Sequence, residues 1–266
     1  MSEECVRVAT APDGVATLTL ERPEIHNAFD DGLIAELTDK LRAVDADAGV
    51  RVVVLAAAGK SFSAGADLNW MKRMARYSEP ENLRDAMRLA GLMHVLDRLR
   101  KPTIARVQGA AFGGGVGLVA CCDMAVAASE AQFCLSEVRL GLIPAVISPY
   151  VIQAIGTRAA RRYFLTAERF DAATALRLGL VSAVVATGEL DATVATLVAH
   201  LLKGGPHALA AAKDLIAAVT DRPIEQAVVE DTARRIAQQR TGAEGREGVA
   251  AFLEKRVAGW VARDER

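Results

Sequence analysis

The stretch Val107-Gln108-Gly109-Ala110-Ala111-Phe112-Gly113-Gly114-Gly115 ends in three consecutive glycines and leads directly into the apolar run Val116–Cys122. We interpret it as a strand followed by a turn and a helix. Glycines at such a junction let backbone N–H groups approach a ligand with no Cβ in the way, and the start of a helix adds the positive end of its dipole. The stretch therefore predicts a site that holds developing negative charge.

A second turn of small residues, Phe62-Ser63-Ala64-Gly65-Ala66-Asp67, follows the β-branched run Val52–Leu55. It could direct another backbone N–H group to the same atom, and two such donors make an oxyanion hole. Either turn alone is more often simple turn geometry. The functional interpretation therefore depends on the order and spacing of further segments.

Several ordered segments together resemble the enoyl-CoA hydratase family, the crotonase superfamily, nearly from end to end. They are Leu20–Ala28, Ser61–Leu68, Gln108–Asp123, Ala131–Glu137, Gly141–Pro144, Ala175–Val181 and Phe252–Arg256. The resemblance implies an α/β fold, a spiral of ββα units with a helical C-terminal trimerisation region. It also implies self-association as a homotrimer or a dimer of trimers. The implied substrate is an acyl-CoA thioester, with no metal and no separate cofactor.

The resemblance also implies roles for three residues. The backbone N–H groups of Ala66 and Gly114 would hold the thioester carbonyl and stabilise an enolate. Glu137 would be the catalytic acid and base. Its apolar neighbours in the sequence, such as Phe133 and Leu135, predict a raised pKa. The alternative for Glu137 is an ordinary surface glutamate in a loop.

Gly117 departs from the pattern, because typical hydratases of this family carry a second glutamate there. A single carboxylate at Glu137 leaves an isomerase that shifts a double bond as the alternative. Ser148 and Tyr150 could also substitute for the missing group, and Gly117 and Tyr150 are expected among the substrate-binding residues. We expect Gly117 to leave room for a branch on the acyl chain.

The segment Gly141–Tyr150, with Trp70 and Cys121-Cys122-Asp123, resembles the bacterial branch that acts on methylglutaconyl-CoA or isohexenylglutaconyl-CoA. This favours a hydratase, a lyase that adds water to a branched or dicarboxylic 2-enoyl-CoA such as 3-methylglutaconyl-CoA, in fatty acid or leucine breakdown. A non-catalytic scaffold that binds acyl-CoA or RNA is a further alternative, against which Glu137 argues.

The remaining substrate-binding residues follow from the resemblance alone. The adenine would be held through main-chain contacts by Ala64, Asp67 and Leu68. The pantetheine or diphosphate would lie near Arg22 or His26, and a neighbouring subunit's CoA would be reached by Phe252 with Lys255. A solvated helix face is the alternative for Lys255.

Composition limits the other possibilities. The 266 residues are 52% hydrophobic but only 5% aromatic, which favours an α/β core of small aliphatic side chains. The formal net charge of −1 argues against a nucleic-acid or membrane partner. The four cysteines and the histidines have no metal-site spacing. With no signal peptide after Met1, we expect a cytoplasmic protein.

The local patterns give an order of elements. They are a hairpin of strands at Val6–Thr10 and Val15–Leu20 around Pro12-Asp13-Gly14, a helix capped by Asp30 or Asp31, a buried strand at Val52–Ala57, a helical stretch Met71–Arg100 interrupted by Pro80, a strand at Thr103–Val107, a strand pair at Met124–Ala128 and Gln132–Leu135, and mostly helix from Ile147 with a short strand at Ser182–Val185. We expect a core domain at 1–190 with the acyl-CoA site and a helical C-terminal region at 191–266.

Overall fold

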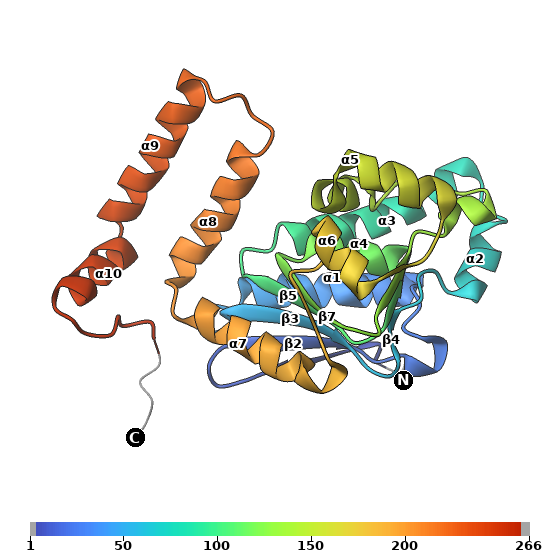
Figure 1. Ribbon diagram of the computed structural model, residues 1–266, viewed down its shortest axis with the longest axis horizontal. Helices are drawn as coiled ribbons and strands as arrows, with labels where there is room; N and C mark the ends of the chain where they lie inside the picture. Colours follow the sequence, from blue (N-terminus) through green and yellow to red (C-terminus); the bar gives the residue numbers. More distant parts are fainter. Residues whose placement is uncertain (1–3, 262–266) are drawn as a thin grey trace.

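The structure of the chain, a computed structural model, describes residues 4–261 and consists of two β-sheets enclosed by helices, with further helices projecting to one side (Figure 1). The first residues, Met1 to Glu3, on which the expectation of no signal peptide rests, lie outside the described part. No helix within 4–261 is both long and apolar enough to cross a membrane.

The larger sheet has six strands and positions most of the core. In spatial order they are β1 (Val6–Thr10), β2 (Val15–Leu20), β3 (Val52–Ala57), β5 (Thr103–Val107), β7 (Met124–Ala128) and β10 (Ala183–Val185). β1 and β2 form the predicted antiparallel hairpin, and the other neighbouring pairs are parallel. Every residue of β3 is buried, as expected for a parallel strand covered on both faces.

The smaller sheet is made of much shorter strands. In spatial order they are β4 (Ser61–Ser63), β6 (Ala110–Phe112), β8 (Gln132–Cys134) and β9 (Phe170–Asp171). After the β1–β2 hairpin, the pairs β3 and β4, β5 and β6, and β7 and β8 each place one strand in the larger sheet and the next in the smaller sheet, and helical structure follows each pair. This arrangement is the expected spiral of ββα units. The two strands expected here, β7 and β8, both form, but they belong to different sheets and do not pair with each other.

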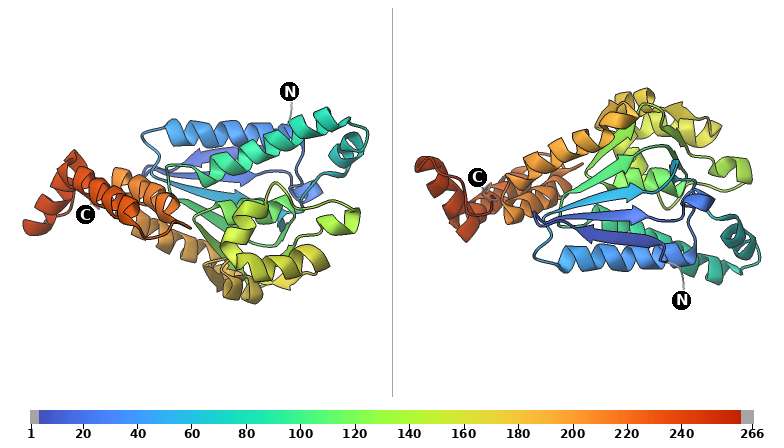
Figure 2. Two further views of the ribbon diagram at one scale, coloured as in Figure 1. Left: turned by 90° about the horizontal axis from the view of Figure 1, so that it is seen from above. Right: turned by 90° about the horizontal axis from the view of Figure 1, so that it is seen from below.

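Helices cover both faces of the larger sheet (Figures 1 and 2). On one face lie α1 (Asp31–Ala46), α3 (Glu79–Asp97) and α4 (Gly114–Cys121), with α5 (Ser148–Thr166) packed over α4 and α6 (Ala172–Leu178) against the smaller sheet, while α2 (Leu68–Met74) precedes α3 at the edge of the molecule. Asp30 caps α1, since its Oδ1 accepts a hydrogen bond of 2.8 Å from Leu33 N. The expected interruption of the helical stretch lies between α2 and α3, just before Pro80, which falls in the first turn of α3 where proline is tolerated.

The C-terminal helices divide into one that packs on the sheet and three that lie away from it. Val194 and Val198 of α7 (Leu190–Leu202) bury against Val54 and Ile104 of the larger sheet. The helices α8 (Pro206–Val219), α9 (Gln226–Thr241) and α10 (Ala243–Leu253) project from the core (Figure 1). We therefore propose that the C-terminal region begins near residue 205, after α7, and not at 191.

Candidate active site

One cavity of about 690 Å³ brings together residues from both glycine turns, from α2 and α3, and from the segment after β8. Most of its lining is apolar. The lining residues are Phe29, Ala64, Gly65, Ala66, Trp70, Met71, Met74, Asn82, Asp85, Ala86, Leu89, Gly113, Gly114, Ser136, Glu137 and the run 140–147. The three residues expected to be catalytic, Glu137, Gly114 and Ala66, are all among them.

The two glycine turns meet at this cavity. Gly65 has a φ of 87°, and a Cβ built on it would lie 3.1 Å from Phe112 O. Gly113 has a φ of 50°, in the left-handed region that favours glycine. Phe29 holds the first turn in place, because its N–H donates to Gly65 O at 2.6 Å and its carbonyl accepts from Asp67 N at 2.7 Å.

The backbone N–H groups of Ala66 and Gly114 have no acceptor within residues 4–261. Gly114 is the first residue of α4, where the first N–H groups of a helix lack a partner inside the helix. Both residues line the cavity, so both donors are free for an oxygen atom there. This arrangement can stabilise an oxyanion.

Glu137 begins a 3-10 helix, Glu137–Leu140, which ends at Gly141 with a φ of 72°. Its carboxyl group is next to the second turn, since a Cβ built on Gly113 would lie 3.2 Å from Glu137 Oε1. Glu137 Oε2 is buried and has no hydrogen-bond partner in the described chain. Burial raises the pKa of Glu137, as the apolar sequence around it predicted, and no neighbouring charge contributes.

Gly117 does not border empty space, so that expectation is wrong. A Cβ built on Gly117 would lie 2.3 Å from Ile147 Cγ2 and 3.2 Å from Met93 Cε. Ile147 lines the cavity, whereas Gly117 is buried behind it. The side chain of Ile147 therefore fills the volume next to Gly117, and the absence of a second glutamate does not leave room there for a substrate branch.

Ser148 and Tyr150 do not substitute for the missing carboxylate within this chain. Ser148 Oγ donates to Ala145 O at 2.8 Å, at the start of α5. Tyr150 lies beside a different, smaller cavity, together with Cys122 and Asp123. Neither residue lines the cavity that contains Glu137, which leaves Glu137 without a second acid or base of the kind expected at these positions.

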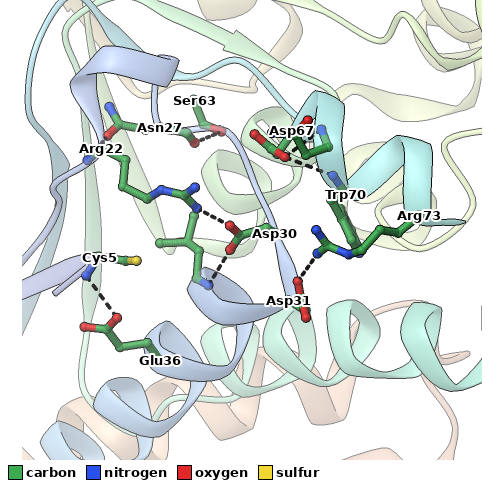
Figure 3. A network of polar contacts seen from close by, with 12 residues as sticks. Cys5, Arg22, Asn27, Asp30, Asp31, Glu36, Ser63, Asp67, Trp70 and Arg73 are labelled. Atoms are coloured by element: carbon green, nitrogen blue, oxygen red, sulfur yellow. Dashed lines mark hydrogen bonds and ion pairs between the residues drawn. The ribbon is translucent and has the colours of Figure 1, made fainter. Parts of the chain in front are cut away.

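The residues expected near CoA are arranged at the first turn and on the loop before α1. Ala64 lines the cavity, and Asp67 caps α2 by accepting hydrogen bonds of 2.8 and 2.9 Å from Asn69 N and Trp70 N. Leu68, next in the chain, is 72% exposed. Figure 3 shows this cap beside the Asp30 network. Their contact with CoA stays a prediction.

Arg22 and His26 lie outside the cavity lining and already have partners. Arg22 Nη1 donates to Asp30 Oδ2 at 2.6 Å (Figure 3). His26 is exposed, and its Nδ1 lies 3.1 Å from Ser61 Oγ. Arg73 of α2 is paired with Asp31 in the same view. If Arg22 contacts CoA, as the sequence predicts, the CoA would bind beside the Arg22–Asp30 ion pair.

Phe252 and Lys255 are remote from the cavity of their own chain. Phe252 lies on α10 and is 82% exposed, and Lys255 follows that helix (Figure 1). Their predicted contact with CoA would therefore require a second subunit.

Several lining residues were not anticipated from the sequence as site residues. Phe29 packs under the second turn, 3.1 Å from a Cβ built on Gly114, and Asn82, Asp85 and Leu89 come from α3. The spacing of the α3 residues by three and four is the signal that could have shown a shared face. Within residues 4–261 no group of three or more His, Cys, Asp or Glu could hold a metal ion.

Comparison with known proteins agrees with the family resemblance seen in the sequence. Residues 10–263 match the family described as enoyl-CoA hydratase/isomerase. The crystal structure of an enoyl-CoA hydratase from Shewanella pealeana is 47% identical, with a TM-score of 0.94 over 96% of each chain. That of an enoyl-CoA hydratase from Mycobacterium smegmatis is 35% identical, with a TM-score of 0.92 over 98% of this chain and 100% of the other. The crotonyl-CoA hydratase of Syntrophomonas wolfei is 31% identical over 94% of this chain and 95% of its own.

Proposed function

The chain belongs to the enoyl-CoA hydratase/isomerase family, and from this premise we propose that it adds water across the 2,3 double bond of a 2-enoyl-CoA thioester. One observation carries the proposal. A buried, unpaired carboxyl oxygen of Glu137 and two free N–H groups, of Ala66 and Gly114, belong to one largely apolar cavity.

In the proposed reaction the thioester carbonyl accepts hydrogen bonds from Ala66 N and Gly114 N. The Glu137 carboxylate takes a proton from a water molecule whose oxygen adds to Cβ, and the electrons of the double bond move to the carbonyl oxygen as an enolate. The enolate then takes the proton from Glu137 at Cα. The water is thus fully used and Glu137 returns to its carboxylate form, for which a raised pKa makes it a stronger base.

The lining of the cavity bears on which acyl group the substrate carries. The sequence resemblance favours a branched or dicarboxylic ester such as 3-methylglutaconyl-CoA, and the cavity volume of about 690 Å³ accommodates a branched chain. However, no Lys, Arg or His is among the described residues that line the cavity, while Asp85 is. A substrate carboxylate would lack a cationic partner there. We therefore propose a branched, uncharged acyl chain, with the dicarboxylic ester as the competitor.

A second candidate is an isomerase that moves the double bond between the 3 and 2 positions. The observation that favours it is the single carboxylate, Glu137, with Ile147 filling the space beside Gly117. Such a reaction only transfers a proton from one carbon to another and needs no activated water.

The experiment that separates these candidates uses purified protein and a panel of CoA esters with product identification by mass spectrometry. The panel contains crotonyl-CoA, a branched 2-enoyl-CoA, 3-methylglutaconyl-CoA and a 3-enoyl-CoA. We expect a gain of one water on the 2-enoyl esters, fastest on the branched one. Conversion of the 3-enoyl ester into its 2-enoyl isomer, which has the same mass, with no hydrated product from any 2-enoyl ester, would show the isomerase instead.

A further inference from the structure

Asp85 is a carboxylate in the wall of the active-site cavity that the proposed reaction does not use. It lies on α3, where Asn82, Asp85, Ala86 and Leu89 all line the cavity, at spacings that place them on one face of the helix. Asp85 is only 6% exposed. An acidic side chain is therefore held inside a cavity that is otherwise mostly apolar.

Within residues 4–261 the carboxylate of Asp85 has neither a hydrogen-bond donor nor an ion-pair partner. The two cavity-lining side chains that carry N–H donors, Asn82 and Trp70, do not donate to it. Asn82 Nδ2 donates to Tyr77 O at 3.2 Å and to Met74 O at 3.4 Å. Trp70 Nε1 is buried and has no acceptor at all. The carboxylate oxygens of Asp85 are not among the fully enclosed atoms of the described chain, so a donor from a ligand or from water in the cavity can reach them.

The position of Asp85 along α3 shows which part of a substrate it would meet. Met93 on the same helix approaches the Cβ position of Gly117, where typical hydratases carry their second glutamate. Asp85 precedes Met93 by two helical turns, about 12 Å at ~1.5 Å per residue. In addition, the charge of Asp85 does not contribute to the raised pKa of Glu137. Asp85 is therefore too far along the helix to replace that glutamate at the reacting carbons.

We propose that Asp85 determines specificity at the distal end of the acyl chain, where it binds a hydrogen-bond donor such as a hydroxyl group and rejects a carboxylate. The proposal rests on the proposed function for the identity of the ligand, an acyl-CoA ester. A hydroxyl can donate to the unpaired oxygens of Asp85. A carboxylate cannot donate, and it would meet a like charge in a cavity whose described lining contains no cationic side chain.

The test measures binding by isothermal titration calorimetry, so that it does not depend on turnover. The ligands are saturated acyl-CoA esters in matched sets: plain, with a terminal carboxylate, and with a hydroxyl moved one carbon at a time along the chain. For the wild type we expect one hydroxyl position to bind about 10- to 100-fold more tightly than the plain ester, as for a hydrogen bond to a charged group. The carboxylate ester should bind more weakly than the plain one.

Three variants identify the responsible group. Asp85→Ala should abolish the difference between hydroxyl and plain esters. Asp85→Asn keeps an acceptor and the shape, so it should retain much of the hydroxyl preference while binding the carboxylate ester better than the wild type does. Glu79→Ala, an exposed glutamate in the first turn of the same helix, is the matched control and should leave all the ratios as in the wild type.

Equal hydroxyl-to-plain ratios in the wild type and in Asp85→Ala would overturn the proposal, and so would a failure of the wild type to bind any ester of the set. A different result concerns the reaction alone. If the wild type shows the expected binding ratios but hydrates no 2-enoyl ester, the specificity role of Asp85 holds and the proposed hydratase activity fails.

Discussion

The side chain of Ile147 occupies the space that any side chain on residue 117 would need, with its Cγ2 only 2.3 Å from a Cβ built on Gly117. Gly117 lies in the interior of α4, and Ile147 directly precedes α5. Two residues thirty positions apart therefore have to be compatible in volume for the glycine turn and the cavity wall to pack together.

Gly117→Ala should destabilise the protein, although helix propensity alone would favour alanine by up to ~1 kcal/mol. The reason is overpacking against Ile147, which typically costs about 1–3 kcal/mol. In Ile147→Ala the Cγ2 atom is absent, so the double variant should be more stable than the sum of the two single effects predicts. Urea unfolding of all four proteins measures this coupling. Additive effects would show that Ile147 does not limit residue 117.

Glu137→Gln should abolish hydration while acyl-CoA binding persists, because the amide keeps the shape of the side chain but cannot transfer the proton. A general acid or base contributes typically about 10²–10⁴-fold in rate, and more if one residue acts in both steps. Steady-state rates on a 2-enoyl-CoA, with calorimetric binding of the saturated ester as the control, provide the check. Activity close to that of the wild type would remove Glu137 from the mechanism.

The stability of the protein should respond to pH through Glu137. Its pKa is raised by burial in the folded state, so its contribution to stability is fully present below the unfolded value of about 4.3 and is lost as the pH rises through the folded pKa. Gln does not titrate. The stability of Glu137→Gln relative to the wild type should therefore increase from acid to neutral pH. Urea midpoints across this range measure it, and parallel curves for the two proteins would contradict the burial effect.

Ala66→Pro should lower kcat by about 10²–10³-fold, because it removes one of the two backbone donors of the proposed oxyanion hole. Ala66→Gly keeps the N–H group and should retain most of the activity. Circular dichroism confirms that both variants are folded before the rates are compared. Equal losses in the two variants would indicate that the side chain, and not the N–H group, is what matters at residue 66.

Self-association stays a prediction, for which α8, α9 and α10 provide the surface. These helices expose large apolar side chains away from the core, among them Ile216, Val229, Ile236, Val249 and Phe252. We expect a trimer or hexamer by light scattering, and its weakening in Ile216→Glu. Leu165→Glu, at a similarly exposed leucine on α5, is the control. A wild-type protein that is monomeric at micromolar concentration would contradict the prediction.

The sequence by itself determined the local elements and the chemical groups of the site. The hairpin β1–β2, the Asp30 cap of α1 and the fully buried β3 follow from turn residues, capping chemistry and apolar runs, which act over a few neighbouring residues. The glycine turns and Glu137 were likewise identified from their order along the chain. In the structure, residues of both turns and Glu137 line one cavity.

Only the tertiary structure decided how these parts meet. The strands β4, β6 and β8 have three residues each, too few for a periodic pattern, so the smaller sheet and the separation of β7 from β8 could not be predicted locally. The contact of Ile147 with Gly117 and the burial of Asp85 without a partner depend on how helices pack across the fold. Packing joins residues far apart in sequence, and for that reason it decided the volume and charge of the cavity that we propose for the acyl chain.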